Sequence, residues 1–172
     1  FSQRFIHRLG VEGRAGYIFQ TSPFLEYSNH QYKAMKNAYA GHLKYSFQLR
    51  PHTVADQAYI GAYQGIGVGY FNFGNPEELG NPLAVYLFQG GRIAQFSPRI
   101  SLNYEWNFGA SFGWKPYDEY DNPENQIIGS KVNAYLNVNL YLKWALSPKF
   151  DLMIGATGSH FSNGNTQYPN SG

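Results

Sequence analysis

Residues 131–144 read KVNAYLNVNLYLKW, and their side chains alternate between two chemical classes. Every even position is apolar, whereas every odd position is lysine, asparagine or tyrosine. Successive side chains of a β-strand point to opposite faces, so this period of two predicts a strand with one apolar and one polar face. The predicted strand is far longer than the roughly five or six residues typical of soluble sheets, and it exceeds the ~9–11 residues that cross a bilayer when tilted.

The same alternation recurs along the chain and predicts an all-β protein. The expected strands cover residues 9–20, 41–50, 57–73, 82–96, 99–108, 131–144 and 150–162. The connections after the second, fourth and sixth segments are short, and those after the first, third and fifth are long. Bacterial outer-membrane barrels have short periplasmic turns and longer outer loops, so we expect the first and seventh strands to run outward.

The composition also favours a transmembrane β-barrel. Aromatic residues reach 18%, while charged residues fall to 14%, against about 25% in soluble domains. No apolar run approaches the ~18 residues of a membrane-spanning helix. The chain has no cysteine, and its net charge of +2 with scattered basic residues does not indicate nucleic-acid binding. Because the chain begins at Phe1 without a signal peptide, we expect a mature or trimmed product.

Seven strands cannot close a barrel of the bacterial single-chain type, which has an even strand number. An open antiparallel sheet would leave two unpaired edges in hydrocarbon. We therefore expect residues 1–172 to form a single domain of an antiparallel, up-and-down, eight-stranded transmembrane β-barrel whose eighth strand lies beyond Gly172.

A soluble barrel of the lipocalin type, with the apolar rows inside, is the alternative. We favour the membrane barrel because its narrow interior would let the charged residues of the polar rows pair with one another, and because aromatic residues tip the apolar rows. The charged residues are Glu12, Arg14, Lys44, Arg50, Arg92, Glu105, Lys131 and Lys143. The aromatic tips, expected at the membrane interfaces, are Tyr17, Phe19, Trp114 and Trp144.

The candidate site is the stretch GSHFSN at residues 158–163, where His160 and Ser162 are two residues apart. On a strand this spacing points a base and a potential nucleophile to the same face. Both residues belong to the apolar, even row, so we expect them on the outer wall of the barrel near its outer end. The alternative is that they only mark the point where the strand leaves the membrane.

This stretch, read with the residues that follow it, resembles the signature of a known family. Residues 160–164 read HFSNG, and Pro169 and Asn170 follow at the expected spacing. The string is similar to that of the outer-membrane lipid A 3-O-deacylases of the PagL type. The resemblance implies an eight-stranded barrel in the outer membrane of a Gram-negative bacterium, with lipid A as the substrate and the active site near the outer leaflet.

The resemblance also implies roles for individual residues. His160 would be the general base and Ser162 the nucleophile of an esterase that removes an ester-linked acyl chain. The oxyanion donors would be Asn163, Gly164 and Asn170, and Asn165 stands where relatives often carry glycine. This set suits ester hydrolysis, which needs an activated hydroxyl and donors aimed at the developing oxyanion.

The acidic member of the triad would fall about two residues beyond Gly172. The acidic residues of the loop 115–129 offer a substitute, or else form a solvated loop; they are Asp118, Glu119, Asp121 and Glu124. The remaining histidines, which we expect to be structural or exposed, are His7, His30, His42 and His52.

The sequence has no metal-ligand spacing or phosphate-binding loop, so we expect neither metal nor cofactor, and lipid A and outer-membrane lipid as the partners. The competing hypothesis is a structural or adhesion barrel with a vestigial His-Ser pair.

Overall fold

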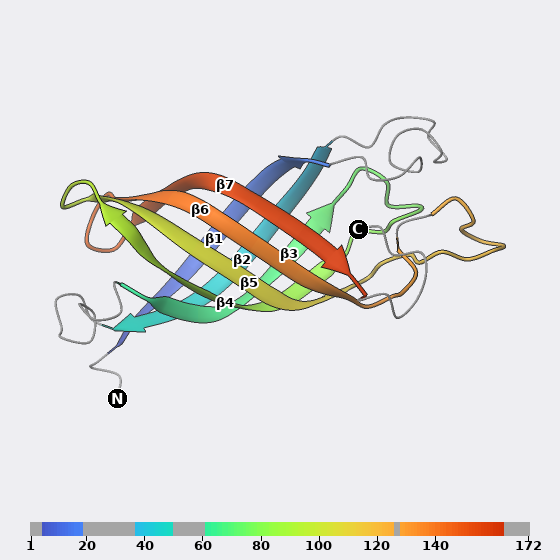
Figure 1. The fold of residues 1–172 in the computed structure, drawn as a ribbon, viewed down its shortest axis with the longest axis horizontal. Helices are drawn as coiled ribbons and strands as arrows, with labels where there is room; N and C mark the ends of the chain where they lie inside the picture. Colours follow the sequence, from blue (N-terminus) through green and yellow to red (C-terminus); the bar gives the residue numbers. More distant parts are fainter. Residues whose placement is uncertain (1–4, 19–36, 50–60, 126–127, 164–172) are drawn as a thin grey trace.

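The structure is a computed structural model, and it describes residues 5–18, 37–49, 61–125 and 128–163. These residues form seven strands (Figure 1). They are β1 (Phe5–Tyr17), β2 (Asn37–Leu49), β3 (Tyr63–Asn72), β4 (Leu83–Gln95), β5 (Ile100–Phe112), β6 (Asn133–Ala145) and β7 (Asp151–Ser162). Each predicted strand is confirmed within the described residues, with shifts of a few residues at the ends, and residues 19–20, 50 and 57–60 of the predicted strands lie outside the described residues. No helix in the described ranges is long and apolar enough to cross a membrane.

The seven strands form one antiparallel sheet in the order of the sequence. The sheet curls until its two edge strands approach each other, since Arg8 on β1 forms an ion pair with Asp151 on β7. In Figure 1 the β4–β5 and β6–β7 turns lie at one end, and the β3–β4 and β5–β6 loops lie at the other, near the end of β7. The up-and-down architecture is therefore confirmed, while the eighth strand stays a prediction.

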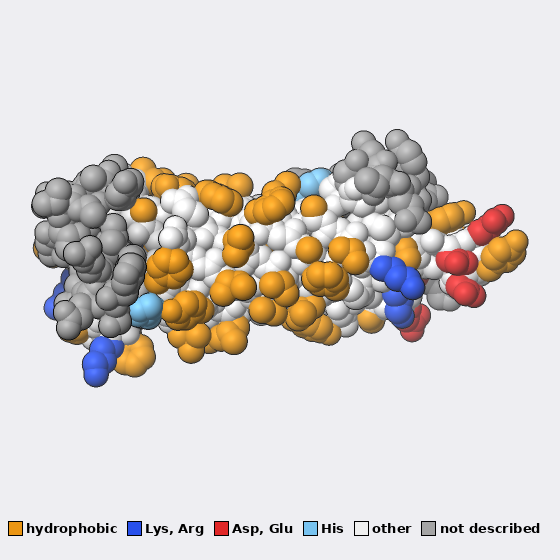
Figure 2. Space-filling model, turned by 90° about the horizontal axis from the view of Figure 1, so that it is seen from below, with side chains coloured by type: hydrophobic (Ala, Val, Ile, Leu, Met, Phe, Trp, Pro, Cys, Tyr) orange, Lys and Arg blue, Asp and Glu red, His pale blue; other side chains and the backbone are white. Residues whose placement is uncertain are grey.

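The apolar rows face outward. On β6 the side chains of Asn133, Tyr135 and Asn137 are buried, whereas Ala134 and Leu136 between them are exposed. Figure 2 shows hydrophobic side chains over the middle of the wall and charged side chains towards its two ends. The lipocalin alternative requires the opposite orientation and is wrong.

The polar rows meet inside the curled sheet, which we call the lumen. The Lys44 ammonium donates to Glu12 Oε1 at 2.9 Å and also pairs with Glu105. Arg14 donates to Glu12 Oε2 at 2.9 Å, and the Tyr63 hydroxyl donates to Glu105 at 2.9 Å. A buried charge is costly unless it is paired, so the network satisfies the predicted pairing for these residues.

The remaining charged residues of the predicted polar row lie elsewhere. Arg92 and Lys143 line a cavity at the end of the short turns. Lys131 is exposed just before β6, and Arg50 lies outside the described residues.

Aromatic side chains fill the other end of the lumen, and one of them corrects a prediction. Trp114, expected at the membrane interface, is only 6% exposed and donates its indole N–H to Ser111 Oγ at 2.8 Å. The reason is that β5 ends at Phe112 and Gly113 has a φ of +87°, which takes the next residue out of the strand alternation. Tyr17 and Trp144 are exposed as expected, and Phe19 lies outside the described residues.

Two loops pack together over these aromatic side chains. The amide of Asn122 donates to the carbonyl of Glu78 at 2.8 Å, and the backbone N–H of Lys115 donates to the carbonyl of Leu79 at 3.0 Å. The amide of Asn125 also donates to Glu78 O at 3.1 Å. The β3–β4 and β5–β6 loops thus support each other at the end of the sheet where β7 finishes.

Candidate active site on the outer wall of β7

The strand register fixes the direction of the candidate catalytic side chains. Ser162 pairs with Ala134 and His160 pairs with Leu136 on β6. Directly paired residues of an antiparallel ladder project to the same face, and these two β6 residues are exposed on the outer wall. His160 and Ser162 therefore project outward together, at the end of β7 nearest the packed loops.

Phe161, between them, points the other way and anchors the end of the strand. Its side chain is 8% exposed. Its ring centroid lies 5.0 Å from Trp114, 5.1 Å from Phe71 and 5.2 Å from Tyr135. Aromatic pairs at these distances add about 0.5–1.5 kcal/mol each beyond the area they bury. The sequence alternation predicts that Phe161 faces inward, but not the partners that hold it.

A second anchor holds β7 at Ser159, two residues before Phe161, and comes from the neighbouring strand β6. Asn137 on β6 is 2% exposed, and its amide lies within donating distance of three acceptors on β7. These acceptors are Thr157 Oγ1 at 2.6 Å, Gly158 O at 3.0 Å and Ser159 Oγ at 2.7 Å. Since the amide has only two protons, the third contact is shared. Asn137 therefore ties the lumen side of β7 to β6 directly before His160.

The surroundings of the pair on the outer wall are apolar. Ala134 pairs with Ala110 on β5, and Leu136 pairs with Phe108. The outer row beside Ser162 thus begins with two small side chains in succession, and the row beside His160 begins with two large ones. Chemically, this placement suits a base and a nucleophile that act on a lipid ester.

The structure describes only part of the predicted oxyanion set. Asn163 follows β7 directly and is half-buried. Gly164 and Asn170 lie outside the described residues. The geometry therefore places His160 and Ser162 on one face, with Asn163 next along the chain, and the donor role of Asn163, Gly164 and Asn170 stays a prediction.

Asp118, one of the acidic loop residues, forms hydrogen bonds within its own loop. The Asp118 carboxylate accepts hydrogen bonds from the backbone N–H groups of Asp121 at 3.0 Å and Tyr120 at 2.8 Å, which hold the pKa of that carboxyl below its usual value. Asp118 thereby shapes a tight turn. Throughout the described ranges, no carboxylate forms a hydrogen bond or ion pair with His160. Those ranges also hold no group of three or more histidine or acidic side chains placed to hold a metal ion.

Fold and site together define the class of the protein: an up-and-down antiparallel wall with an apolar outer surface, a polar lumen and a histidine-serine pair on the outside. The profile of the family described as Lipid A 3-O-deacylase (PagL) matches residues 7–172, nearly the whole chain. The chain belongs to this family of outer-membrane hydrolases that act on lipid A. No curated protein and no solved structure matches the chain.

Proposed function

We propose that this protein is a serine esterase that removes the 3-O-linked acyl chain from lipid A, with Ser162 as nucleophile and His160 as general base. The observation that carries the proposal is the alternation at the end of β7. Phe161 is fixed in the lumen, so His160 and Ser162 both project to the outer wall. A substrate that resides in the membrane reaches that wall directly, without entering the lumen.

The chemistry follows the usual course of a serine ester hydrolase. His160 accepts the proton of the Ser162 hydroxyl as its oxygen attacks the ester carbonyl. The tetrahedral intermediate collapses, the sugar hydroxyl leaves with the proton returned by His160, and the acyl chain remains on Ser162. Water, deprotonated by His160, then attacks the acyl-enzyme; the bond between the acyl carbon and Ser162 Oγ breaks, His160 returns the proton to Ser162, and the fatty acid is released. Both steps use one base in turn and require no cofactor.

The oxyanion of each tetrahedral intermediate needs hydrogen-bond donors. Asn163, Gly164 and Asn170 are the residues that we assign to this role. Their support is the family membership and, for Asn163, its position directly after Ser162. Losing one such donor typically lowers kcat by about 10²–10³-fold.

Residues 1–172 are proposed to belong to one barrel domain in the outer membrane of a Gram-negative bacterium. The end with the packed loops and His160 would face outside, and the end with the short turns would face the periplasm, as in other barrels of this type. The site would then meet lipid A in the outer leaflet.

The test is the Ser162→Ala variant, refolded in detergent and incubated with lipopolysaccharide. We expect fatty-acid release to fall by at least ~10³-fold, as for other serine hydrolases that lose the nucleophile. Electrophoretic mobility of unheated samples would report whether the barrel is folded. Ser147→Ala is the matched control, because Ser147 lies in the turn at the opposite end. Release at the wild-type level by folded Ser162→Ala would refute Ser162 as the nucleophile, whereas absence of release by both folded proteins would favour the non-enzymatic barrel.

A further inference from the structure

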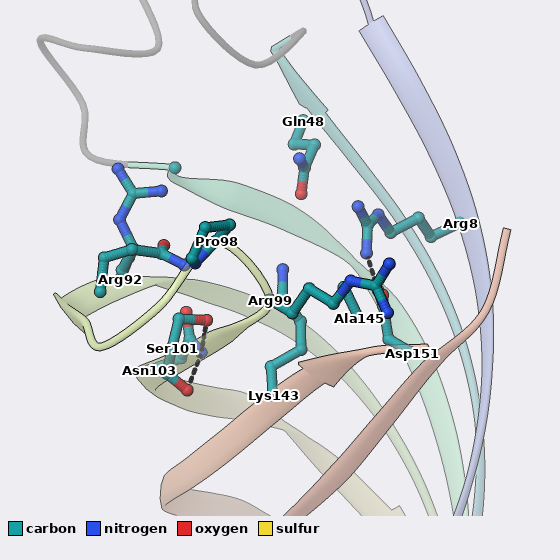
Figure 3. A pocket seen from close by; sticks show the side chains of 12 residues that line it. Arg8, Gln48, Arg92, Pro98, Arg99, Ser101, Asn103, Lys143, Ala145 and Asp151 are labelled. Carbon is teal, nitrogen blue, oxygen red and sulfur yellow. Dashed lines mark hydrogen bonds and ion pairs between the residues drawn. The ribbon is translucent and has the colours of Figure 1, made fainter. Parts of the chain in front are cut away.

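The two ends of β7 are held in different ways. At its beginning, Asp151 forms an ion pair with Arg8 beside a polar cavity of about 170 Å³ (Figure 3). At its other end, which carries the proposed catalytic pair, the side chain of Phe161 is enclosed by aromatic rings. Within the described residues β7 pairs with β6 alone, so the rings that come from other elements tie its end to the rest of the molecule.

Trp114 is the ring that links Phe161 to the loops. Its centroid lies 5.0 Å from that of Phe161 at an interplanar angle of 73°, and 5.5 Å from that of Phe73, on which it stacks at 16°. The centroids of Phe73 and Phe161 are 5.8 Å apart, so the three rings all contact one another. Trp114 and Phe73 follow the last residues of β5 and β3, and both rings therefore belong to the loops and not to the wall.

The indole of Trp114 is fixed in one orientation. Its Nε1 donates to Ser111 Oγ at 2.8 Å, and the Ser111 hydroxyl donates to the carbonyl of Asn133 at 2.9 Å. Trp114 is 6% exposed and Ser111 is fully buried. Closely packed interiors transmit displacements, so a movement of the Trp114 backbone is passed to Phe161 and is not absorbed by rotation of the ring.

The backbone on both sides of Trp114 rests on the β3–β4 loop. The backbone N–H of Lys115 donates to the carbonyl of Leu79 at 3.0 Å. A Cβ atom at Gly80 would lie only 2.5 Å from the carbonyl oxygen of Gly113. The two loops thus meet backbone against backbone directly beside Trp114, where even a methyl group does not fit.

We propose that Trp114 is a positioning residue, which passes the position of the β3–β4 loop to Phe161 and thereby sets the direction of His160 and Ser162. Phe161 shares its backbone with the two outward residues on either side, so a shift of its ring turns both of them. A misplacement of about 1 Å can lower the rate of a reaction about 10²-fold. The effect on catalysis rests on the proposed function, whereas the packing link does not.

The packing link is tested by Gly80→Ala, with Gly74→Ala as the matched control. The two glycines have φ values of +80° and +77°, so alanine strains the backbone equally at both positions. Nothing lies within 4 Å of a Cβ atom at Gly74, whereas at Gly80 the added methyl group pushes on Gly113.

Amide hydrogen exchange of the refolded barrel in detergent, followed by NMR, measures this link without reference to activity. We expect exchange at residues 160–162 to be at least about tenfold faster in Gly80→Ala than in Gly74→Ala, because the end of β7 opens more readily. Equal exchange in the two variants would overturn the proposal, whether or not the protein is an esterase.

The effect on catalysis is tested by two substitutions of Trp114. Trp114→Ala should lower kcat per folded protein at least about tenfold with little change in KM, because it leaves the outer wall unchanged. Trp114→Phe keeps a ring against Phe161 and should recover most of this loss. No recovery in Trp114→Phe would overturn the role that we assign to the ring.

Phe88→Ala separates positioning from stability. Phe88 is 3% exposed in the same lumen, and its ring lies beside Tyr63 and Tyr86. It should lose stability while the folded protein keeps its kcat, and a loss of kcat equal to that of Trp114→Ala would overturn the positioning role. A wild type that releases no fatty acid would refute the proposed function, and the exchange measurement would then decide the packing link alone.

Discussion

The imidazole Nδ1 of His42 on β2 and the phenol oxygen of Tyr86 on β4 lie 2.7 Å apart, although β3 runs between these two strands. Two glycines of β3 make the contact possible, because Gly69 pairs with His42 and Gly67 pairs with Tyr86. A Cβ atom at Gly69 would lie 2.6 Å from the His42 ring, and one at Gly67 would lie 2.5 Å from the Tyr86 ring. The two rings thus contact each other over the backbone of β3, in space that the missing side chains of Gly67 and Gly69 leave open.

Gly67→Ala should therefore destabilise the barrel. The added methyl group would displace the Tyr86 ring, and overpacking of this kind typically costs about 1–3 kcal/mol. Urea titration of the folded barrel in detergent, followed by tryptophan fluorescence, measures the change. Gly41→Ala on β2 is the control, since nothing lies within 4 Å of a Cβ atom there. Equal unfolding midpoints for the two variants would contradict the packing described here.

Asn137→Ala should lower the rate of deacylation by more than the loss of folded protein can explain. The substitution removes the amide that contacts Thr157, Gly158 and Ser159, so the end of β7 that carries His160 is held less firmly against β6. We expect kcat to fall at least about tenfold with little change in KM, because the substitution leaves the outer wall, where we propose that the substrate binds, unchanged.

Asn139→Ala is the comparison for this effect. Asn139 is buried in the same lumen row, but its amide donates to Glu105 at 3.3 Å and not to β7. It should lose stability while the folded fraction keeps its kcat. If both variants lose kcat to the same extent, Asn137 has no positioning role.

Ala134→Phe should obstruct the proposed nucleophile. Ala134 pairs directly with Ser162 on the outer wall, so a phenyl ring there would cover the approach of an ester to the hydroxyl. We expect release of fatty acid from lipopolysaccharide to fall by about tenfold or more, at unchanged barrel stability. Ala156→Phe adds the same ring to the outer row of β7 beside Leu140, four residues from His160. Comparable activity of the two variants would contradict the approach of the ester to Ser162 past Ala134.

The carboxyl group of Asp118 should titrate below the usual pH range of an aspartate. Its carboxylate accepts two backbone N–H groups in the folded loop, which lowers its pKa. This hydrogen bonding stabilises the loop above the pKa of the unfolded chain and is lost as pH falls through the lower folded value. The amide resonances of Tyr120 and Asp121 should therefore shift with a midpoint below that of an unperturbed aspartate. Asp118→Asn should abolish this titration, and a midpoint at the ordinary value would contradict it.

Local alternation predicts the faces of the strands well, because a period of two is decided by each segment alone. It places Leu136 outward and Asn137 inward, and it puts His160 and Ser162 on one side of β7. It fails where the backbone leaves the strand geometry. Trp114 lies past a glycine of positive φ.

Contacts between strands are beyond that reasoning. Alternation within one strand does not predict its register against the next strand. The contact of His42 with Tyr86 over two glycines of β3 could therefore not be predicted. The pairing of charges is hidden for the same reason: Lys44 pairs with Glu12 and Glu105 in the lumen, and Arg8 pairs with Asp151 across the two edge strands. For the site, spacing predicts the His-Ser pair, but Phe161 becomes an anchor only through the aromatic side chains that three other segments bring to it.

Inward residues such as Phe161 and outward residues of the same strands differ in how easily they can be substituted. Inward residues such as Phe161 and Asn137 are fixed by many partners, and changing one of them requires changes in the others. Outward residues such as Ala110, Ala134 and Leu136 project from the wall, and their substitution does not repack the lumen. The outer wall can therefore change one side chain at a time on a constant scaffold, and under the proposed function adaptation to a new acyl chain would not require a new barrel.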